Sequence, residues 1–90
     1  MEYEEFRRSV LYSVANILAK HRGSIARIKS RDIAKIMGIK VTPVKAYTIF
    51  VILSNFKDVT DIRGRKWVLN EIYSKKVTGV KIAEYVRVDL

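Results

Sequence analysis

The chain has 90 residues, of which 49% are hydrophobic and 30% are charged, and its 18 lysines and arginines outnumber nine acids to give a net charge of +9. A chain of this length forms a single domain, and the absence of cysteine excludes disulfides and thiolate chemistry. The longest apolar run, residues 49–53, is far too short to span a bilayer, so no membrane association is expected. Because we see no secretion signal, we expect a cytoplasmic protein. The lack of glutamine and the many charged residues are typical of a thermophile.

The first predicted helix covers residues 2–21. Its charges suit the helix dipole, because acids occupy the first turn and Lys20, His21 and Arg22 lie at the other end. Gly23 is expected to stop the helix in a left-handed conformation. An apolar stripe at helical spacing makes this helix a core element, and it consists of Phe6, Val10, Leu11, Val14, Ile17 and Leu18.

Residues 25–29 are short and partly β-branched, and they predict a small strand beside a later hairpin. Ser30 is expected to cap a second helix, with Asp32 in its first turn. Gly38 is expected to end that helix. The residues predicted to face the core are Ile33, Ala34, Ile36 and Met37.

A third helix is predicted from a cap at Thr42 to about Asn55. Pro43 takes the first helical position, where its missing N–H costs nothing. Val51 and Ile52 are expected on the outer side of this helix. The inner side is expected to consist of Ala46, Ile49, Phe50, Leu53 and Phe56.

Two strand-like runs, residues 59–62 and 66–69, flank the sequence Arg63-Gly64-Arg65. Since Gly64 can adopt a positive φ, these runs predict a hairpin with a basic tip. For the rest of the chain the pattern allows a fourth helix over residues 70–77 and also a strand-like alternation. The alternating residues are Val80, Ile82, Val86 and Val88.

The positive charge is concentrated in two parts of the chain. Residues 20–45 hold eight basic residues and one acid, which is +7 of the total of +9. Residues 57–66 add four basic residues and two acids. Most charge runs form an ordinary solvated surface, but these two coincide with the paired short helices and with the hairpin tip. The coincidence favours a polyanionic partner.

The order helix, strand, helix, helix, hairpin resembles that of winged helix-turn-helix proteins, the small DNA-binding domains of bacterial and archaeal transcription regulators. This resemblance implies an α+β fold in which a three-helix core carries a β-hairpin wing. Residues 1–90 would then form one domain, with the core at about 6–70 and a C-terminal extension at 71–90. The residues that carry the resemblance are Ser30-Arg-Asp-Ile-Ala, Gly38-Ile39, Thr42-Pro43, Ala46, Ile49, Leu53 and Arg63-Gly64-Arg65.

The resemblance implies a protein of archaeal type that binds double-stranded DNA, regulates transcription and pairs as a homodimer. The third helix (about 42–55) would read the major groove, and the wing (about 59–69) would reach the minor groove or flanking phosphates. The candidate DNA-binding residues are Arg27, Lys29, Arg31, Lys40, Thr42, Pro43, Val44, Lys45, Tyr47, Thr48, Arg63, Arg65 and Lys66.

Two alternatives remain open. The outward Val51 and Ile52 depart from the family, in which polar side chains usually occupy such positions, and they favour docking to a protein. The chain would then be an accessory subunit of a DNA-processing assembly, such as a replicative polymerase complex, that uses these residues and its C-terminal segment. The other alternative is a ribosomal or RNA-binding winged helix, which the isoelectric point near 10.0 allows.

Catalysis finds little support in the residues. His21 is the only histidine and lies between two cations. Neither a cluster of metal-ligating side chains nor a glycine-rich phosphate loop is present. We therefore expect no enzymatic activity and no catalytic residue, metal, cofactor or small-molecule ligand.

Overall fold

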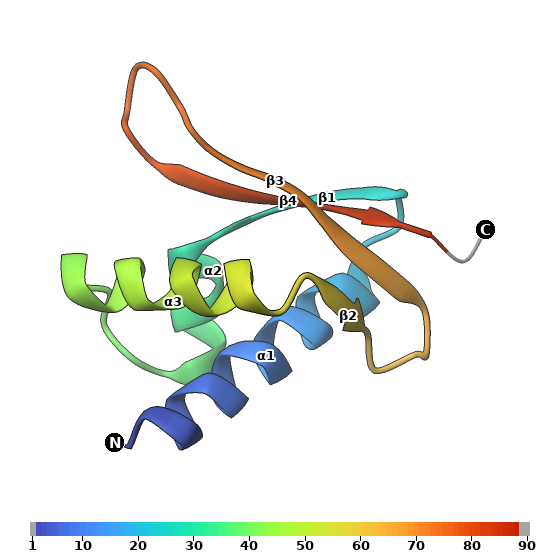
Figure 1. The fold of residues 1–90 in the computed structure, drawn as a ribbon, viewed down its shortest axis with the longest axis horizontal. Coiled ribbons are helices and arrows are strands. Elements are labelled where there is room, and N and C mark those ends of the chain that lie inside the picture. Colours follow the sequence, from blue (N-terminus) through green and yellow to red (C-terminus); the bar gives the residue numbers. More distant parts are fainter. Residues whose placement is uncertain (1, 89–90) are drawn as a thin grey trace.

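Three helices lie on one face of a four-stranded antiparallel sheet (Figure 1). The computed structural model describes residues 2–88, so residue 1 and the last two residues of the predicted C-terminal extension lie outside it. The chain is an α+β protein, as its sequence predicts. Within the described residues the elements are α1 (Tyr3–Lys20), β1 (Ile25–Lys29), α2 (Ser30–Met37), α3 (Pro43–Asn55), β2 (Asp58–Thr60), β3 (Lys66–Ser74) and β4 (Lys81–Arg87).

Helix α1 forms one wall of the core and confirms the predicted apolar stripe. Val10, Val14 and Leu18 are fully buried, and burying one aliphatic side chain of this size is worth about 1.5–3 kcal/mol. The predicted stop at Gly23 is wrong: the chain leaves the helix at His21, with φ −81° and ψ 133°, and Gly23 has no positive φ. A side chain from the β2–β3 turn binds the last carbonyl groups of α1, so the helix needs no left-handed cap.

The cap of helix α2 lies one residue earlier than predicted. Ser30 is the first helical residue, and the cap is Lys29, whose backbone N–H donates to the Asp32 carboxylate at 3.0 Å. A carboxylate at this position satisfies a free N–H and suits the positive end of the dipole. Gly38 ends the helix with φ 71°, as predicted. Ile36 is 40% exposed and does not face the core, because it lines an open groove between α1 and α2.

Helix α3 begins and ends where the sequence predicts. Thr42 Oγ1 accepts the N–H of Lys45 at 3.2 Å, and Pro43 occupies the first helical position. Ile49 and Leu53 are fully buried, as expected. Ile52 is fully buried as well, which contradicts its predicted exposure. The reason is that α3 contacts α1 and α2 and also lies under the sheet (Figure 1), so that more than one of its sides is covered.

The strand order is β1-β4-β3-β2, so the chain's last strand lies inside the sheet. Residues 71–88 are therefore part of the fold and not an extension of it. The predicted fourth helix over residues 70–77 is wrong, whereas the predicted alternation corresponds to β4. Strand β3 contains a register shift between Leu69 and Glu71, so that Trp67, Leu69 and Ile72 all pack against the core. The step of three residues from Leu69 to Ile72 resembles the period of a helix, which explains why the pattern allowed a helix in this segment.

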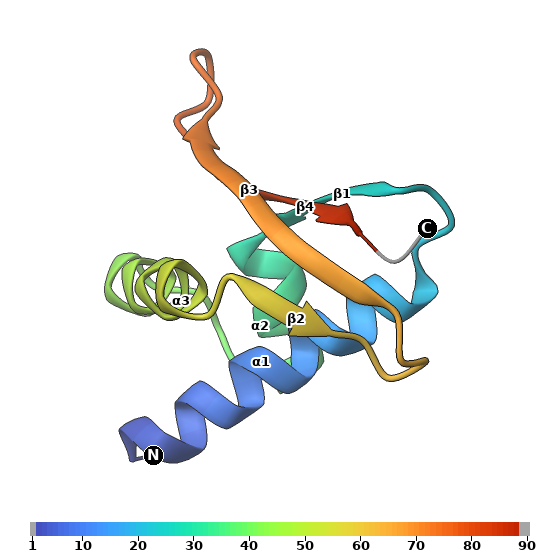
Figure 2. The same ribbon diagram turned by 45° about the vertical axis from the view of Figure 1, so that its right-hand side comes forward.

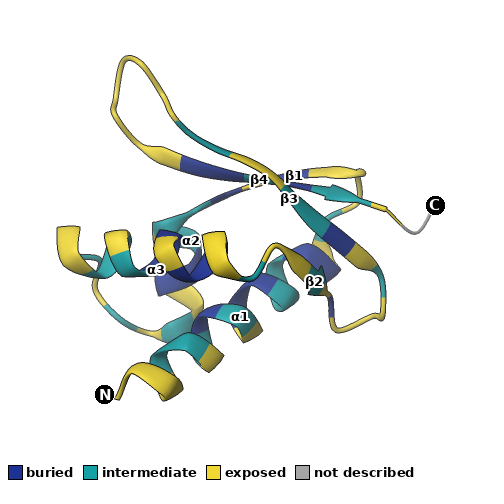
Figure 3. Ribbon diagram, viewed as in Figure 1, coloured by how far each residue is buried: buried dark blue, intermediate teal, exposed yellow. Residues whose placement is uncertain are grey.

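The core fills the space between the helices and the sheet. Trp67 and Tyr85 are its largest fully buried side chains, and burial raises the pKa of the Tyr85 phenol. Buried residues occur on all three helices and on the sheet, while the hairpin tips are exposed (Figure 3). Among residues 2–88, no helix combines the length and the hydrophobicity that crossing a membrane requires.

Candidate nucleic-acid interface

The first turns of α3 form an exposed surface. Val44 and Tyr47 are 74% and 67% exposed, and Pro43 is exposed too. Lys45 and Thr48 are half-buried. All five belong to the predicted DNA-binding residues, and the structure leaves all of them accessible from solvent.

Two threonines of this surface make hydrogen bonds within their own helix. Thr42 Oγ1 accepts the N–H of Lys45, and Thr48 Oγ1 donates to the Val44 carbonyl at 2.9 Å. A hydroxyl has one proton to donate and two lone pairs to accept with. Thr42 therefore keeps its proton for an external acceptor such as a phosphate oxygen, whereas Thr48 must first break its bond to Val44. Of the two threonines, Thr42 is therefore the one better placed to donate a hydrogen bond to a phosphate.

The tip of the β3–β4 hairpin projects beyond the rest of the sheet (Figures 1 and 2), and we call its residues 74–81 the arm. Strand β1 covers β4 only as far as Ile82, which pairs with Lys29. Beyond that pair the hairpin has no neighbouring strand. Within the arm, the Lys75 N–H donates to the Val80 carbonyl at 2.9 Å, and the Gly79 N–H donates to the Lys75 carbonyl at 2.8 Å. The arm is thus a hydrogen-bonded projection.

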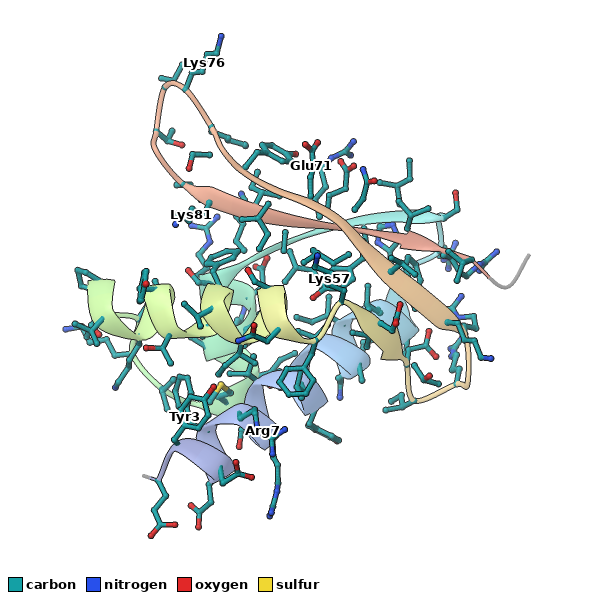
Figure 4. The ribbon with its side chains drawn as sticks, in the orientation of Figure 1. Tyr3, Arg7, Lys57, Glu71, Lys76 and Lys81 are labelled. Atoms are coloured by element: carbon teal, nitrogen blue, oxygen red, sulfur yellow. The ribbon has the colours of Figure 1, made fainter. Side chains whose placement is uncertain are left out.

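A groove separates the arm from α3. One part has a volume of about 350 Å³ and includes Pro43 and Tyr47 from the helix and Val80 and Lys81 from the arm. A second part of about 240 Å³ shares Tyr47 and Lys81 with the first. Figure 4 shows Lys81 at the start of β4, on the side of the strand nearest α3. The exposed turns of α3 and the base of the arm therefore form one continuous surface.

This surface is built from two segments without acidic residues. Residues 33–57 contain four lysines and no Asp or Glu, and residues 72–83 contain three lysines and no Asp or Glu. Lys76 lies at the tip of the arm (Figure 4). Since no carboxylate in either segment offsets these charges, both segments carry a net positive charge, which favours a polyanion.

The predicted wing at residues 59–69 has another role. The Arg65 guanidinium donates to the carbonyls of Leu18, Ala19 and His21 at 2.9, 2.9 and 3.3 Å and pairs with Asp61 at 3.0 Å. It thus holds the end of α1 and is not positioned to bind DNA, which corrects its predicted function. The turn that carries it lies beyond the C-terminal end of α3, far from the arm (Figure 1). Only Arg63 is an exposed arginine there.

Asp61 is the centre of that turn. Its carboxylate is 3% exposed and accepts hydrogen bonds from the backbone N–H groups of Arg63 and Arg65, from the Arg65 side chain and from the Trp67 indole at 2.9 Å. Burial alone would raise the pKa of Asp61, but the bonds from Trp67, the two backbone groups and Arg65 outweigh it and lower the pKa to about 2. The cluster is structural.

The remaining predicted residues are divided between two faces. Arg27 and Lys29 alternate with the buried Ala26 and Ile28, so they lie on the sheet face away from α3. Arg27 also pairs with Glu84 at 3.2 Å. The structure does not bring this pair together with α3. The other predicted cations, all exposed, are Arg31 at the start of α2, Lys40 in the turn before α3 and Lys66 on β3.

The lysines of the arm, Lys75, Lys76 and Lys81, are not among the residues that the sequence predicts to bind DNA. They lie in the predicted C-terminal extension, whose pattern allows both a helix over residues 70–77 and a strand-like alternation. A signal was present, because Gly79 separates two runs with strand-like composition and takes φ 70° in the turn. Three cations of the candidate interface could have been found from it.

Two further observations complete the description of the site. Among residues 2–88, no group of three or more His, Cys, Asp and Glu side chains could hold a metal ion. In comparisons with known proteins, the chain matches no family model, no curated protein and no solved structure. The interpretation of the surface therefore depends on its own geometry and charge.

Proposed function

We propose that this chain is a winged-helix protein that binds double-stranded DNA and regulates transcription. The first turns of α3 enter the major groove, and the arm is the wing that follows the neighbouring backbone. The observation that carries the proposal is the pair of acid-free segments, 33–57 and 72–83, which together contain seven lysines and form the two sides of the groove that Lys81 lines. The element order and the pairing of β4 with β1 support the winged-helix interpretation.

The dimensions of α3 suit a major groove. A helix with its side chains is about 10–12 Å across, and the major groove of B-DNA is about 12 Å wide. Lys45 would donate to a guanine or a phosphate, Thr42 and Tyr47 would donate to phosphates, and Val44 would contact a thymine methyl group. These contacts need exposed first turns, which α3 has.

The cations of the two acid-free segments are all lysines. A lysine ammonium acts as a point charge, whereas the planar arginine guanidinium binds guanine through two parallel bonds. We therefore expect phosphates to supply most of the affinity. Sequence preference would come from the few side chains at the start of α3, above all Val44, Lys45 and Tyr47.

The burial of Ile52 weakens the case for protein docking, because half of the predicted docking pair is not at the surface. Val51 alone is 37% exposed. DNA is favoured over duplex RNA for a geometric reason: the major groove of A-form RNA is too deep and narrow for a helix.

A salt titration tests the proposal. Binding to a 20–30 base-pair duplex should weaken steeply with salt, with a log–log slope of about −4 to −5 if roughly four to six phosphates are neutralised. Duplex RNA should compete poorly. A flat salt response, or equal affinity for duplex RNA, would contradict the proposal, and so would binding to an acidic protein but not to DNA.

Two substitutions identify the surface. Lys45→Ala and Lys81→Ala should each reduce the salt slope by about one unit, because each removes a phosphate contact. The matched control is Lys20→Ala, at an exposed lysine in the last turn of α1. If the control weakens binding as much as the two variants do, DNA does not bind at the groove.

A further inference from the structure

The apex of the arm carries an exposed apolar side chain. Val77 is 97% exposed, the highest value among the large hydrophobic residues described. It lies inside the turn that the Gly79–Lys75 hydrogen bond closes, where Gly79 has φ 70°. The Val80 N–H also donates to Thr78 Oγ1 at 3.3 Å. The turn therefore holds Val77 at the end of the arm, away from the body of the protein.

An isolated exposed valine is common on protein surfaces and means little by itself. The surroundings of Val77 distinguish it from such an isolated valine. Lys75 and Lys76 precede it, no acid occurs between residues 72 and 83, and the base of the arm lines the same groove as α3. An apolar apex between cations, beside a helix proposed to lie in the major groove, suits a contact with stacked bases.

We propose that the apex of the arm enters the DNA minor groove and that Val77 wedges between two base pairs, which bends the duplex. This inference rests on the proposed function. Apolar wedges in the minor groove partly unstack a base step and kink DNA by roughly 20–90°. Lys75 and Lys76 would bind the phosphates on the two sides of the groove and so offset part of the cost of unstacking.

The reach and width of the arm fit this placement. Val77 lies four positions after Tyr73, the partner of Ile82, so the arm projects at most about 13 Å at 3.3 Å per residue, and less than this because residues 76–78 form a turn. The minor groove is about 7.5 Å deep and 6 Å wide. Two paired strands are already about 4.8 Å apart before side chains are added. Only the apex can therefore enter, and Val77 is the apolar side chain there.

A DNA-bending assay tests the inference. Energy transfer between dyes at the two ends of a duplex should increase when the wild-type chain binds, because bending shortens the distance between the ends. The fluorescence of 2-aminopurine at the contacted base step should also increase as that base unstacks. Val77→Thr keeps the shape of the side chain but replaces one methyl group with a polar hydroxyl, so it should remove at least half of the change in transfer efficiency. Because Val77 is exposed, the variant should keep the Trp67 fluorescence of the folded protein.

The matched control is Val88→Thr, at a residue that follows β4 and is 55% exposed. It should bend DNA as the wild type does. Binding without bending, or equal bending by Val77→Thr and the wild type, would overturn the wedge and leave the proposed function intact. Failure of the wild type to bind any duplex would overturn both.

Discussion

The carboxylate of Asp61 offers the sharpest test of how the fold is held together. It is buried, accepts four hydrogen bonds and has a pKa of about 2, against 3.8 for an ordinary aspartate. A pKa that is lower in the folded state means that ionisation stabilises the fold. The shift corresponds to about 2 kcal/mol of the free energy of unfolding. This contribution is complete above the unfolded-state pKa and is lost as the pH falls from about 4 to 2.

The perturbation is Asp61→Asn. The amide has nearly the same shape, but it loses the charge and presents an NH₂ group to N–H donors that need an acceptor. We expect the free energy of unfolding at pH 7 to fall by about 2–4 kcal/mol. Domains of this size have total stabilities of about 5–15 kcal/mol, so the variant should fold and the loss should be measurable.

The assay is urea unfolding at several pH values between 7 and 2, followed by the fluorescence of Trp67, the only tryptophan and a fully buried one. Between pH 5 and 2 the wild type should lose about 2 kcal/mol more stability than Asp61→Asn does. The control is Asp58→Asn, at an exposed aspartate on β2. Equal pH dependence in the wild type and Asp61→Asn would refute the reasoning.

Four other outcomes are expected. Arg65→Ala should lower the free energy of unfolding by about 2–4 kcal/mol, because it unpairs a buried carboxylate and the carbonyls at the end of α1. Arg63→Ala, at the neighbouring exposed arginine, should change it by less than about 0.5 kcal/mol. Gly38→Ala should cost about 1–2 kcal/mol in a melting experiment, since its φ is 71° although space for a Cβ is open. Sedimentation should show a homodimer. The apolar row on the outer face of the sheet that could form the dimer contact is Ile25, Val86 and Val68. A protein that stays monomeric at high concentration and does not pair on DNA would contradict this prediction.

Local chemistry determined the helices of this protein and the short strand between them. The Thr42 cap, Pro43 in the first turn and the left-handed Gly38 act over three or four residues, and their effect can be read directly from the chain. The periodicity of α1 is equally local, because one stripe of residues faces one core. The sequence therefore predicted the exposed first turns of α3, which form one side of the candidate interface.

Contacts between residues far apart in the sequence determined the remaining features of the fold and of the candidate interface. Arg65 looks like a DNA-binding residue in a basic turn, but its carbonyl partners lie 44–47 positions away along the chain. Helix α3 is apolar on several sides, so its sequence alone does not show that Ile52 is covered. The register shift in β3 spaces its core-facing residues three positions apart, as in a helix, and for this reason the sequence pattern did not reveal the hairpin that forms the arm. The basic side of the groove opposite α3 exists only because β3 and β4 pair across the turn at Gly79; Gly79 marks this turn in the sequence, but the register of the two strands depends on contacts between them.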